Sequence, residues 1–95
     1  MASYRLSDRA LKDLDRLYEH GILSFGLSVA DEFYDGLIAR FQAIADQPSQ
    51  YPAIDDIREG YRRSVCGAHS IYFRIDSEGV EILRILGRED PTKAF

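Results

Sequence analysis

The sequence predicts an α+β fold, with a short N-terminal strand, a helical hairpin and a three-stranded antiparallel meander that form one sheet covered by helices on one face. Apolar residues recur at helical spacing in the first half of the chain and alternate with polar residues in the last third. Pro48 and Pro52 lie between these regions, where neither pattern continues. No linker or repeat divides the 95 residues, so we expect a single domain over residues 1–95.

The first elements are expected to be a short strand and a helix. Tyr4 and Leu6 alternate with polar neighbours, which is typical of a strand. Ser7 is a typical helix N-cap, and apolar residues follow it at helical spacing. The expected buried positions of this helix are Leu11, Leu14, Leu17 and Tyr18.

A second helix is expected to follow the first after a glycine-containing joint. Ser28 and Asp31 have the spacing of a capping box, which predicts the start of this helix. Pro48 predicts its end, because proline cannot continue a helix. The expected buried stripe is Ala30, Phe33, Leu37, Phe41 and Ile44.

The last third predicts three strands, at residues 61–66, 70–75 and 80–86. In the middle strand Ile71, Phe73 and Ile75 alternate with Ser70, Tyr72 and Arg74. A turn ending in Gly79 joins the last two strands. The final strand is apolar on both faces except at Glu81 and Arg84. Because a charge among apolar residues needs a partner, we expect Arg84 to form a structural salt bridge.

Composition restricts the function. The net charge of −4 disfavours phosphate binding as the main activity, so no sequence-specific contact with nucleic acid is expected. No apolar run is long enough to span a membrane and no signal sequence is visible, which predicts a cytoplasmic protein. The single cysteine excludes an internal disulfide, and one cysteine with two histidines gives no metal-site spacing. We expect no metal and no cofactor.

Three segments together resemble the ParE branch of the RelE/ParE toxin family. They read DIREGYRR at 56–63, GAHSIYFRI at 67–75 and VEILRILGRED at 80–90, in the order that the family shows. The resemblance covers nearly the whole chain and implies the RelE/ParE fold. Such proteins are the toxins of bacterial type II toxin–antitoxin systems. RelE-like members cut messenger RNA on the ribosome, whereas ParE-like members poison DNA gyrase.

The resemblance also bears on catalysis. Ser70, Gly87 and Phe95 stand where RelE-like relatives carry Arg, His and Tyr, and only Arg88 falls near a catalytic basic position. Arginine is a poor base because its pKa is very high. Cys66 and His69, placed on one extended strand at odd spacing, are expected on opposite faces and thus not to form a nucleophilic pair. We therefore expect no catalytic residues and predict gyrase inhibition, with ribosome-dependent mRNA cleavage as the alternative.

Binding sites are then expected for an antitoxin and for a target. The implied antitoxin is ParD-like, with a ribbon-helix-helix domain and an amphipathic C-terminal tail, and the implied target is DNA gyrase. The candidate antitoxin-binding residues are Arg62, Arg63, Tyr72 and Arg74, and the candidate target-binding residues are Arg84, Arg88 and Phe95. Arginine suits such surfaces because its planar fork binds carboxylates in pairs. The competing interpretation is that each arginine pairs with a nearby Asp or Glu on the surface, an ion pair that contributes little to stability.

Overall fold

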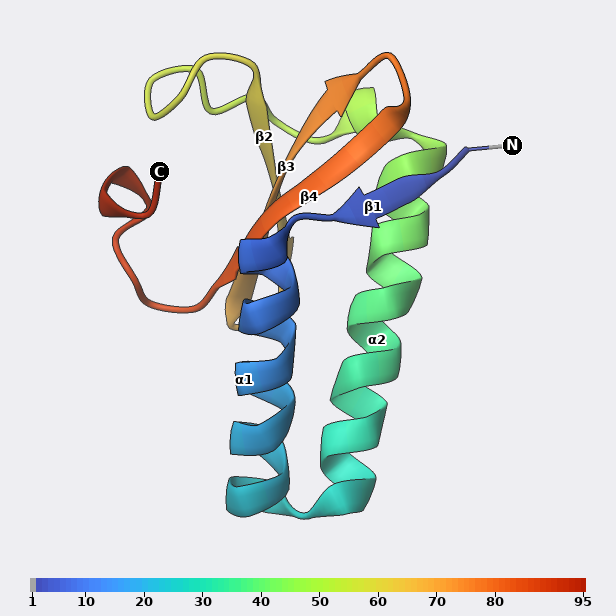
Figure 1. Cartoon of the computed structure of the whole chain (residues 1–95), viewed down its shortest axis with the longest axis vertical. Coiled ribbons are helices and arrows are strands. Elements are labelled where there is room, and N and C mark those ends of the chain that lie inside the picture. Colours follow the sequence, from blue (N-terminus) through green and yellow to red (C-terminus); the bar gives the residue numbers. More distant parts are fainter. Residues whose placement is uncertain (1) are drawn as a thin grey trace.

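The computed structural model describes residues 2–95, and its elements follow the predicted order (Figure 1). The strands are β1 (Tyr4–Leu6), β2 (Tyr61–Cys66), β3 (His69–Asp76) and β4 (Gly79–Leu86). The helices are α1 (Asp8–Phe25) and α2 (Leu27–Asp46), with two short 3-10 helices, η1 (Pro48–Gln50) and η2 (Pro91–Lys93). The predicted α+β class is confirmed.

The four strands form one mixed sheet in the order β1-β4-β3-β2. β2, β3 and β4 make the predicted antiparallel meander, while β1 runs parallel to β4 and completes the sheet. α1 and α2 form an antiparallel hairpin that extends beyond one end of the sheet, and the C-terminal segment (residues 87–95) folds back beside the strands (Figure 1). In the part of the chain that is described, no helix is long and apolar enough to cross a membrane.

α1 begins where the sequence predicts, but its buried face is rotated by about one position. The Oγ of Ser7 accepts a hydrogen bond from the backbone N–H of Ala10 at 3.1 Å, which confirms Ser7 as the N-cap. Leu14 is buried as expected, whereas Leu11 is 48% exposed and Ala10 takes its place in the core. The same rotation buries Asp13, a charged residue that had not been assigned to the core.

α2 begins at Leu27, directly after Gly26, and no side chain caps it. The predicted capping box is therefore wrong, because Ser28 and Asp31 both lie inside the helix. Gly26 has a φ of +89°, a conformation that glycine adopts without strain, so one residue suffices to join the two helices. The predicted buried stripe of α2 is confirmed at Ala30, Leu37, Phe41 and Ile44, and Phe33 is partly buried.

The main core lies between the helices and the sheet. Its largest fully buried side chains are Phe41, Phe73, Leu37, Ile44, Ile71, Ile82 and Ile85. A second cluster of Ile54, Tyr72 and Leu86 lies outside this core, and the C-terminal residues Ala94 and Phe95 pack against it. The C-terminal segment is thus part of the packed structure.

The alternation of β3 and β4 is interrupted by a bulge. Tyr72 pairs with Arg84 but Phe73 pairs with Ile82, so Leu83 is an extra residue on β4. The bulge lets Ile82 and Ile85 both face the helices although their spacing is odd. Burial on β3 departs from the sequence alternation at two positions: Tyr72, in the polar series, is only 3% exposed, and Ile75, in the apolar series, is 44% exposed. Tyr72 is buried because it belongs to the second cluster. Ile75 is exposed because it lies near the end of its strand.

Candidate functional site

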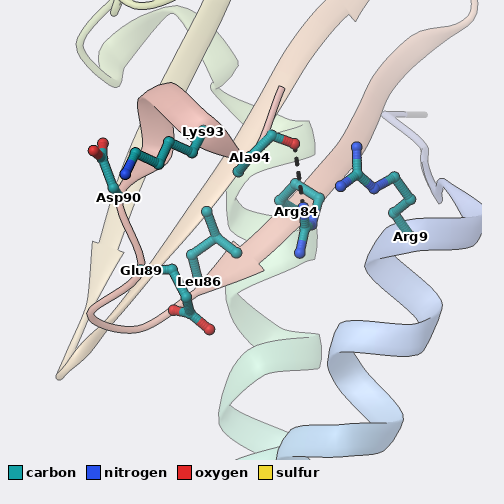
Figure 2. Close-up of a pocket in the computed structure, with 7 residues that line it drawn as sticks. All are labelled: Arg9, Arg84, Leu86, Glu89, Asp90, Lys93 and Ala94. Carbon is teal, nitrogen blue, oxygen red and sulfur yellow. Dashed lines mark hydrogen bonds between the residues drawn. The ribbon is translucent and has the colours of Figure 1, made fainter.

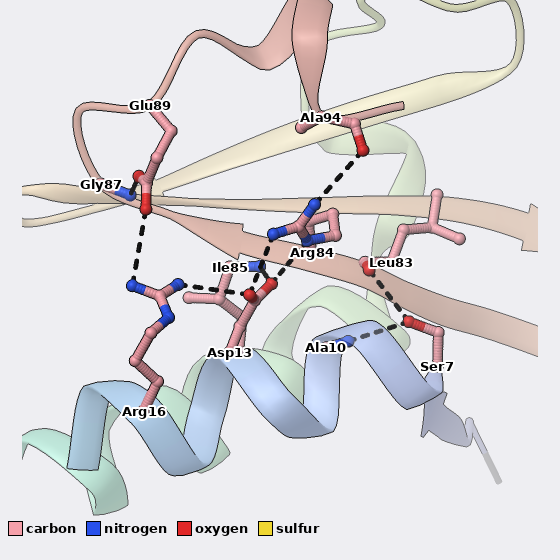
Figure 3. Close-up of polar contacts among 10 residues, drawn as sticks. All are labelled: Ser7, Ala10, Asp13, Arg16, Leu83, Arg84, Ile85, Gly87, Glu89 and Ala94. Carbon is pink, nitrogen blue, oxygen red and sulfur yellow. Dashed lines mark hydrogen bonds and ion pairs between the residues drawn. The ribbon is translucent and has the colours of Figure 1, made fainter. Parts of the chain in front are cut away.

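Because β1 is short, the second half of β4 has no strand partner on that side, and residues at and after the start of α1 supply hydrogen bonds there. β1 pairs only with residues 80–82 of β4. Beyond them, Ser7 Oγ donates to the carbonyl of Leu83 at 2.9 Å, and the backbone N–H of Ile85 donates to Asp13 Oδ2 at 3.0 Å (Figure 3). Ser7 and Asp13 therefore satisfy backbone groups of β4 on the side that β1 does not reach.

Asp13 also forms a bidentate ion pair with Arg84. Arg84 Nε donates to Asp13 Oδ2 at 2.7 Å and Nη2 donates to Oδ1 at 3.0 Å. The remaining Arg84 nitrogen, Nη1, donates to the carbonyl of Ala94 at 3.2 Å, which links the pair to the C-terminal segment (Figure 3). The structural salt bridge predicted for Arg84 is confirmed. Asp13, its partner, was missed, because only the fold brings two residues 71 positions apart together.

The electrostatics of this pair agree with its geometry. Burial by itself raises the pKa of the Asp13 carboxyl, but hydrogen bonds from Arg84 and from the Ile85 N–H outweigh burial and lower it overall. The hydrogen bond to Asp13 raises the pKa of Arg84, against the effect of its own burial. Arg16 Nη2 adds a further contact to Asp13 Oδ1 at 3.2 Å, and Arg16 Nη1 lies 3.6 Å from Glu89 Oε1. Both members of the pair are therefore charged and held by several partners.

The C-terminal segment is fastened at both ends. Glu89 Oε2 accepts from the backbone N–H of Gly87 at 2.6 Å, and Asp90 caps η2 by accepting from Thr92 N at 3.0 Å. Phe95 packs edge-on against Tyr61 and Tyr72, with ring centroids 5.0 and 5.4 Å apart. The last residue of the segment therefore packs against the sheet, although residues 88–90 are exposed.

Two of the three candidate target-binding residues lie together. Arg84 and Phe95 line one hollow of about 230 Å³. A neighbouring hollow of about 350 Å³ shares Arg84 and is drawn in Figure 2. Arg88 lines neither; it borders a separate hollow beside His69 that is also lined by residues of the second half of α1.

The candidate antitoxin-binding residues are divided between the two faces of the sheet. Arg63 pairs with Tyr72 and Arg74 with Tyr61, so these four residues share the face away from the helices. Arg62 pairs with Phe73 and thus lies on the helix face. Arg63 is half-buried on the outer face, and its Nε is buried without a hydrogen-bond partner within residues 2–95.

The other arginines of this group have partners. Arg62 Nη1 donates to the carbonyl of Tyr51 at 2.7 Å. Arg74 forms an ion pair with Glu81, at 2.9 Å from Nε and 2.8 Å from Nη2. Tyr72 is covered by Phe95. The structure therefore joins Arg63, Tyr72 and Arg74 on one surface and separates Arg62 from them.

Cys66 and His69 lie closer than expected. They face each other as paired residues across the turn between β2 and β3, so their placement on opposite faces of one strand is wrong. The His69 ring packs on Phe33 with centroids 5.2 Å apart. Burial lowers the pKa of His69, with a smaller opposing effect of Glu89. The packing on Phe33 and the lowered pKa of His69 both favour a neutral ring.

Comparison with known proteins identifies the family. The model described as "ParE toxin of type II toxin-antitoxin system, parDE" matches residues 4–91. The chain is 35% identical over 86 residues to Toxin ParE1 of Caulobacter vibrioides, covering 90% of this chain and 88% of that protein. It is 29% identical over 84 residues to Toxin ParE1 of Mycobacterium tuberculosis, covering 87% and 86%.

Two solved structures share the fold. One is described as the chromosomal ParDE TA system from P. aeruginosa, with a TM-score of 0.81, 23% identity and coverage of 94% of this chain and 98% of that chain. The other is the toxin–antitoxin complex RelBE2 from Mycobacterium tuberculosis, with a TM-score of 0.56, 26% identity and coverage of 92% and 98%. The chain, with its RelE/ParE fold, therefore belongs to the ParE toxin family of type II toxin–antitoxin systems.

Proposed function

We propose that this toxin inhibits DNA gyrase and that a cognate antitoxin neutralises it. The observation that carries the first part is the state of Arg84 and Phe95. RNA cleavage needs a base, an acid and cationic groups that are free to meet the phosphate. Arg84 already directs three nitrogens to Asp13 and Ala94, and the Phe95 ring has no hydroxyl to donate. A toxin that acts by binding needs neither group to be free.

The neighbouring positions support the same proposal. Ser70 pairs with Leu86, the residue before Gly87, so two positions at which RelE-like relatives carry Arg and His are adjacent at this end of the sheet. In this chain the first position is Ser70, with an ordinary hydroxyl, and the second is Gly87, with no side chain. Arg88 is exposed and can hold a phosphate, but it is a poor base. Because catalytic groups act as a unit, losing several leaves little activity.

The antitoxin part of the proposal rests on the relatives and on the outer sheet face. The two similar structures are described as a ParDE system and a toxin–antitoxin complex. We take the partner to be ParD-like, with a ribbon-helix-helix domain and an amphipathic tail. Of the four candidate residues, Arg63 and Arg74 are proposed to contact this tail, while Tyr72 supports Phe95 and Arg62 holds the preceding loop. Guanidinium groups on an open sheet face suit an acidic segment.

Two assays run in parallel test the target. Purified toxin should block supercoiling by DNA gyrase and leave messenger RNA intact in a ribosome-dependent cleavage assay. The protein encoded by the adjacent antitoxin gene should bind the toxin and restore supercoiling. Codon-phased cuts in the messenger RNA, without an effect on gyrase, would establish the RelE-like alternative instead.

A further inference from the structure

The hollow beside Phe95 collects guanidinium groups from three separate parts of the chain. It opens between the start of α1, the loop before β2 and the chain's last residue, and has a volume of about 230 Å³. Arg9, Arg58 and Arg84 all line it, together with the rings of Tyr61 and Phe95. Such a grouping is unusual for a chain whose net charge is −4.

Arg9 and Arg58 are not paired with carboxylates within residues 2–95. Both are exposed, whereas Arg84 is neutralised by Asp13. Within residues 2–95, Asp8 has the one acidic side chain in the lining of this hollow, and Phe95 adds the main-chain carboxylate at the end of the 95-residue chain. By contrast, Arg5, Arg16 and Arg74, elsewhere on the surface, all pair with carboxylates. The hollow therefore keeps positive charge available for an external anion.

Aromatic rings accompany these charges. The Cζ of Arg58 lies 5.9 Å from the centroid of the Tyr61 ring, and Tyr61 contacts Phe95 edge-on at 5.0 Å. Guanidinium groups bind phosphate oxygens in pairs, and aromatic rings with neighbouring arginines stack on nucleic-acid bases. An acidic peptide would need the charges but not the ring pair. The combination fits a nucleotide unit with both a phosphate and a base.

A second hollow of mixed charge lies beside the first, along the C-terminal segment. The neighbouring hollow of about 350 Å³ shares Arg9 and Arg84 and adds Lys93, while Glu89 and Asp90 also line it (Figure 2). Figure 2 shows Arg9 extending from α1 toward Arg84 and the C-terminal segment. Arg9 and Arg84 thus lie between the two hollows, with Arg58 in one and Lys93 in the other.

We propose that Arg9 and Arg58, with Tyr61 and Phe95, form a binding site for the sugar–phosphate backbone and an unstacked base of DNA. The site deepens, and rests on, the proposed inhibition of gyrase, because gyrase holds a cleaved DNA strand on which such a contact acts. The toxin then touches the DNA of the target complex without sequence specificity and without chemistry. Arg84 is a positioning residue, since it fixes the end of the chain beside the site.

The test measures binding of a fluorescein-labelled single-stranded oligonucleotide and its duplex by anisotropy over a range of salt concentrations. Arg9→Gln/Arg58→Gln is compared with Arg5→Gln/Lys12→Gln, which removes the same charge outside the hollow. The first pair should lower the slope of log affinity against log salt by about 1.5, because two phosphate contacts are lost. The control pair should leave that slope close to the parent's. Phe95→Ala should weaken single-strand binding more than duplex binding. Circular dichroism checks that each variant is folded.

Three results would overturn the site: equal losses in both double variants, no DNA binding by the parent chain at low salt, or a labelled poly-glutamate that binds as tightly and is lost in the same variant. Gyrase supercoiling is assayed on the same proteins. Full inhibition by Arg9→Gln/Arg58→Gln would also remove the site but leave the gyrase proposal standing. DNA binding that needs Arg9 and Arg58, without any gyrase inhibition by the parent, would support the site and overturn the proposed target.

Discussion

Asp13 of α1 and Arg84 of β4 form a buried bidentate ion pair that joins the first helix, the bulged strand and the C-terminal segment (Figure 3). Their side chains are 6% and 15% exposed. The carboxylate of Asp13 also accepts a hydrogen bond from the N–H of Ile85, so it both neutralises Arg84 and satisfies a backbone group of β4. Asp13 thus contacts β4 directly and is linked to the C-terminal segment through Arg84.

Replacing Asp13 should therefore be costly. Asp13→Ala should lower the free energy of unfolding by about 3 kcal/mol, because it leaves a mostly buried guanidinium and a backbone N–H without partners. Asp15→Ala, an exposed change on the same helix, should stay within about 0.5 kcal/mol of the parent. Urea titrations of both variants measure the difference. Similar losses in the two would mean that the ion pair adds nothing beyond helix propensity.

Stability should fall on acidification in two windows. Burial lowers the pKa of His69, so below its ordinary value of about 6.5 the unfolded chain binds a proton that the folded chain resists, and stability declines. Burial raises the pKa of Asp13, but the hydrogen bonds from Arg84 and Ile85 lower it overall. Its contribution is complete above the unfolded value of about 3.9 and is lost as the pH falls through the lower folded value.

Two variants separate these windows. In urea midpoints measured from neutral to acidic pH, His69→Gln should flatten the first decline and leave the second. Asp13→Asn should flatten part of the second only, because Asp76, Glu89 and Asp90 also have lowered pKa values. A parent curve with no slope near pH about 6 would remove His69 from this account.

The helical phase of α2 can be tested at Phe41, with Phe25 of α1 as an exposed control. Phe41 is fully buried and its ring lies 5.6 Å from that of Tyr4, whereas Phe25, at the end of α1, is 68% exposed. Phe41→Ala should cost about 3–5 kcal/mol, the usual range for a buried aromatic side chain. Phe25→Ala should leave the melting temperature nearly unchanged. A shift of only a few degrees for Phe41→Ala would contradict the assignment of its face.

Two glycines should respond in opposite directions to the same substitution. Gly79 has a φ of +117°, and a Cβ there would lie 2.7 Å from the carbonyl oxygen of Ser3, so Gly79→Ala should destabilise by more than about 1 kcal/mol. Gly36 lies in α2 with no atom within 4 Å of the added Cβ, so Gly36→Ala should stabilise by about 0.5–1 kcal/mol. Thermal melts of both variants measure these changes. A lower melting temperature for Gly36→Ala would contradict the prediction and show that Gly36 has a packing role.

The fold was predictable from local signals that act within a few residues. Ser7 caps α1, Pro48 follows α2, and the change of apolar period after residue 60 separates helices from strands. The joint between the helices was misplaced because Ser28 and Asp31 match a capping box, although the single residue Gly26 makes the turn. The sequence pattern cannot distinguish a capping box at Ser28 and Asp31 from a turn at Gly26, since both are compatible with the start of a helix.

The candidate site was only partly predictable, because it depends on contacts between distant residues. Arg84 carried a visible signal, a charge on an apolar strand, but nothing local points to Asp13 as its partner. The bulge at Leu83 has no sequence signature, and it changes which side chains face the helices. Arg9 and Arg58 meet at Phe95 only in three dimensions, which is why neither was among the candidate residues.

Arg62 and Arg63 provide the sharpest test of the proposed antitoxin surface, because they are adjacent in sequence but lie on opposite faces of β2. Arg63→Glu should weaken the complex tenfold or more, about 1.4 kcal/mol, since it places a negative charge where an acidic tail is proposed to dock. Arg62→Glu should instead lose its hydrogen bond to the Tyr51 carbonyl and lower stability by about 1 kcal/mol. Its affinity for the antitoxin should stay near the parent's at a temperature where both variants are folded. Calorimetric titration with the adjacent gene's antitoxin, beside a thermal melt of each toxin variant, measures the two effects separately. Weaker binding of Arg62→Glu with full affinity of Arg63→Glu would move the antitoxin to the helix side of the sheet.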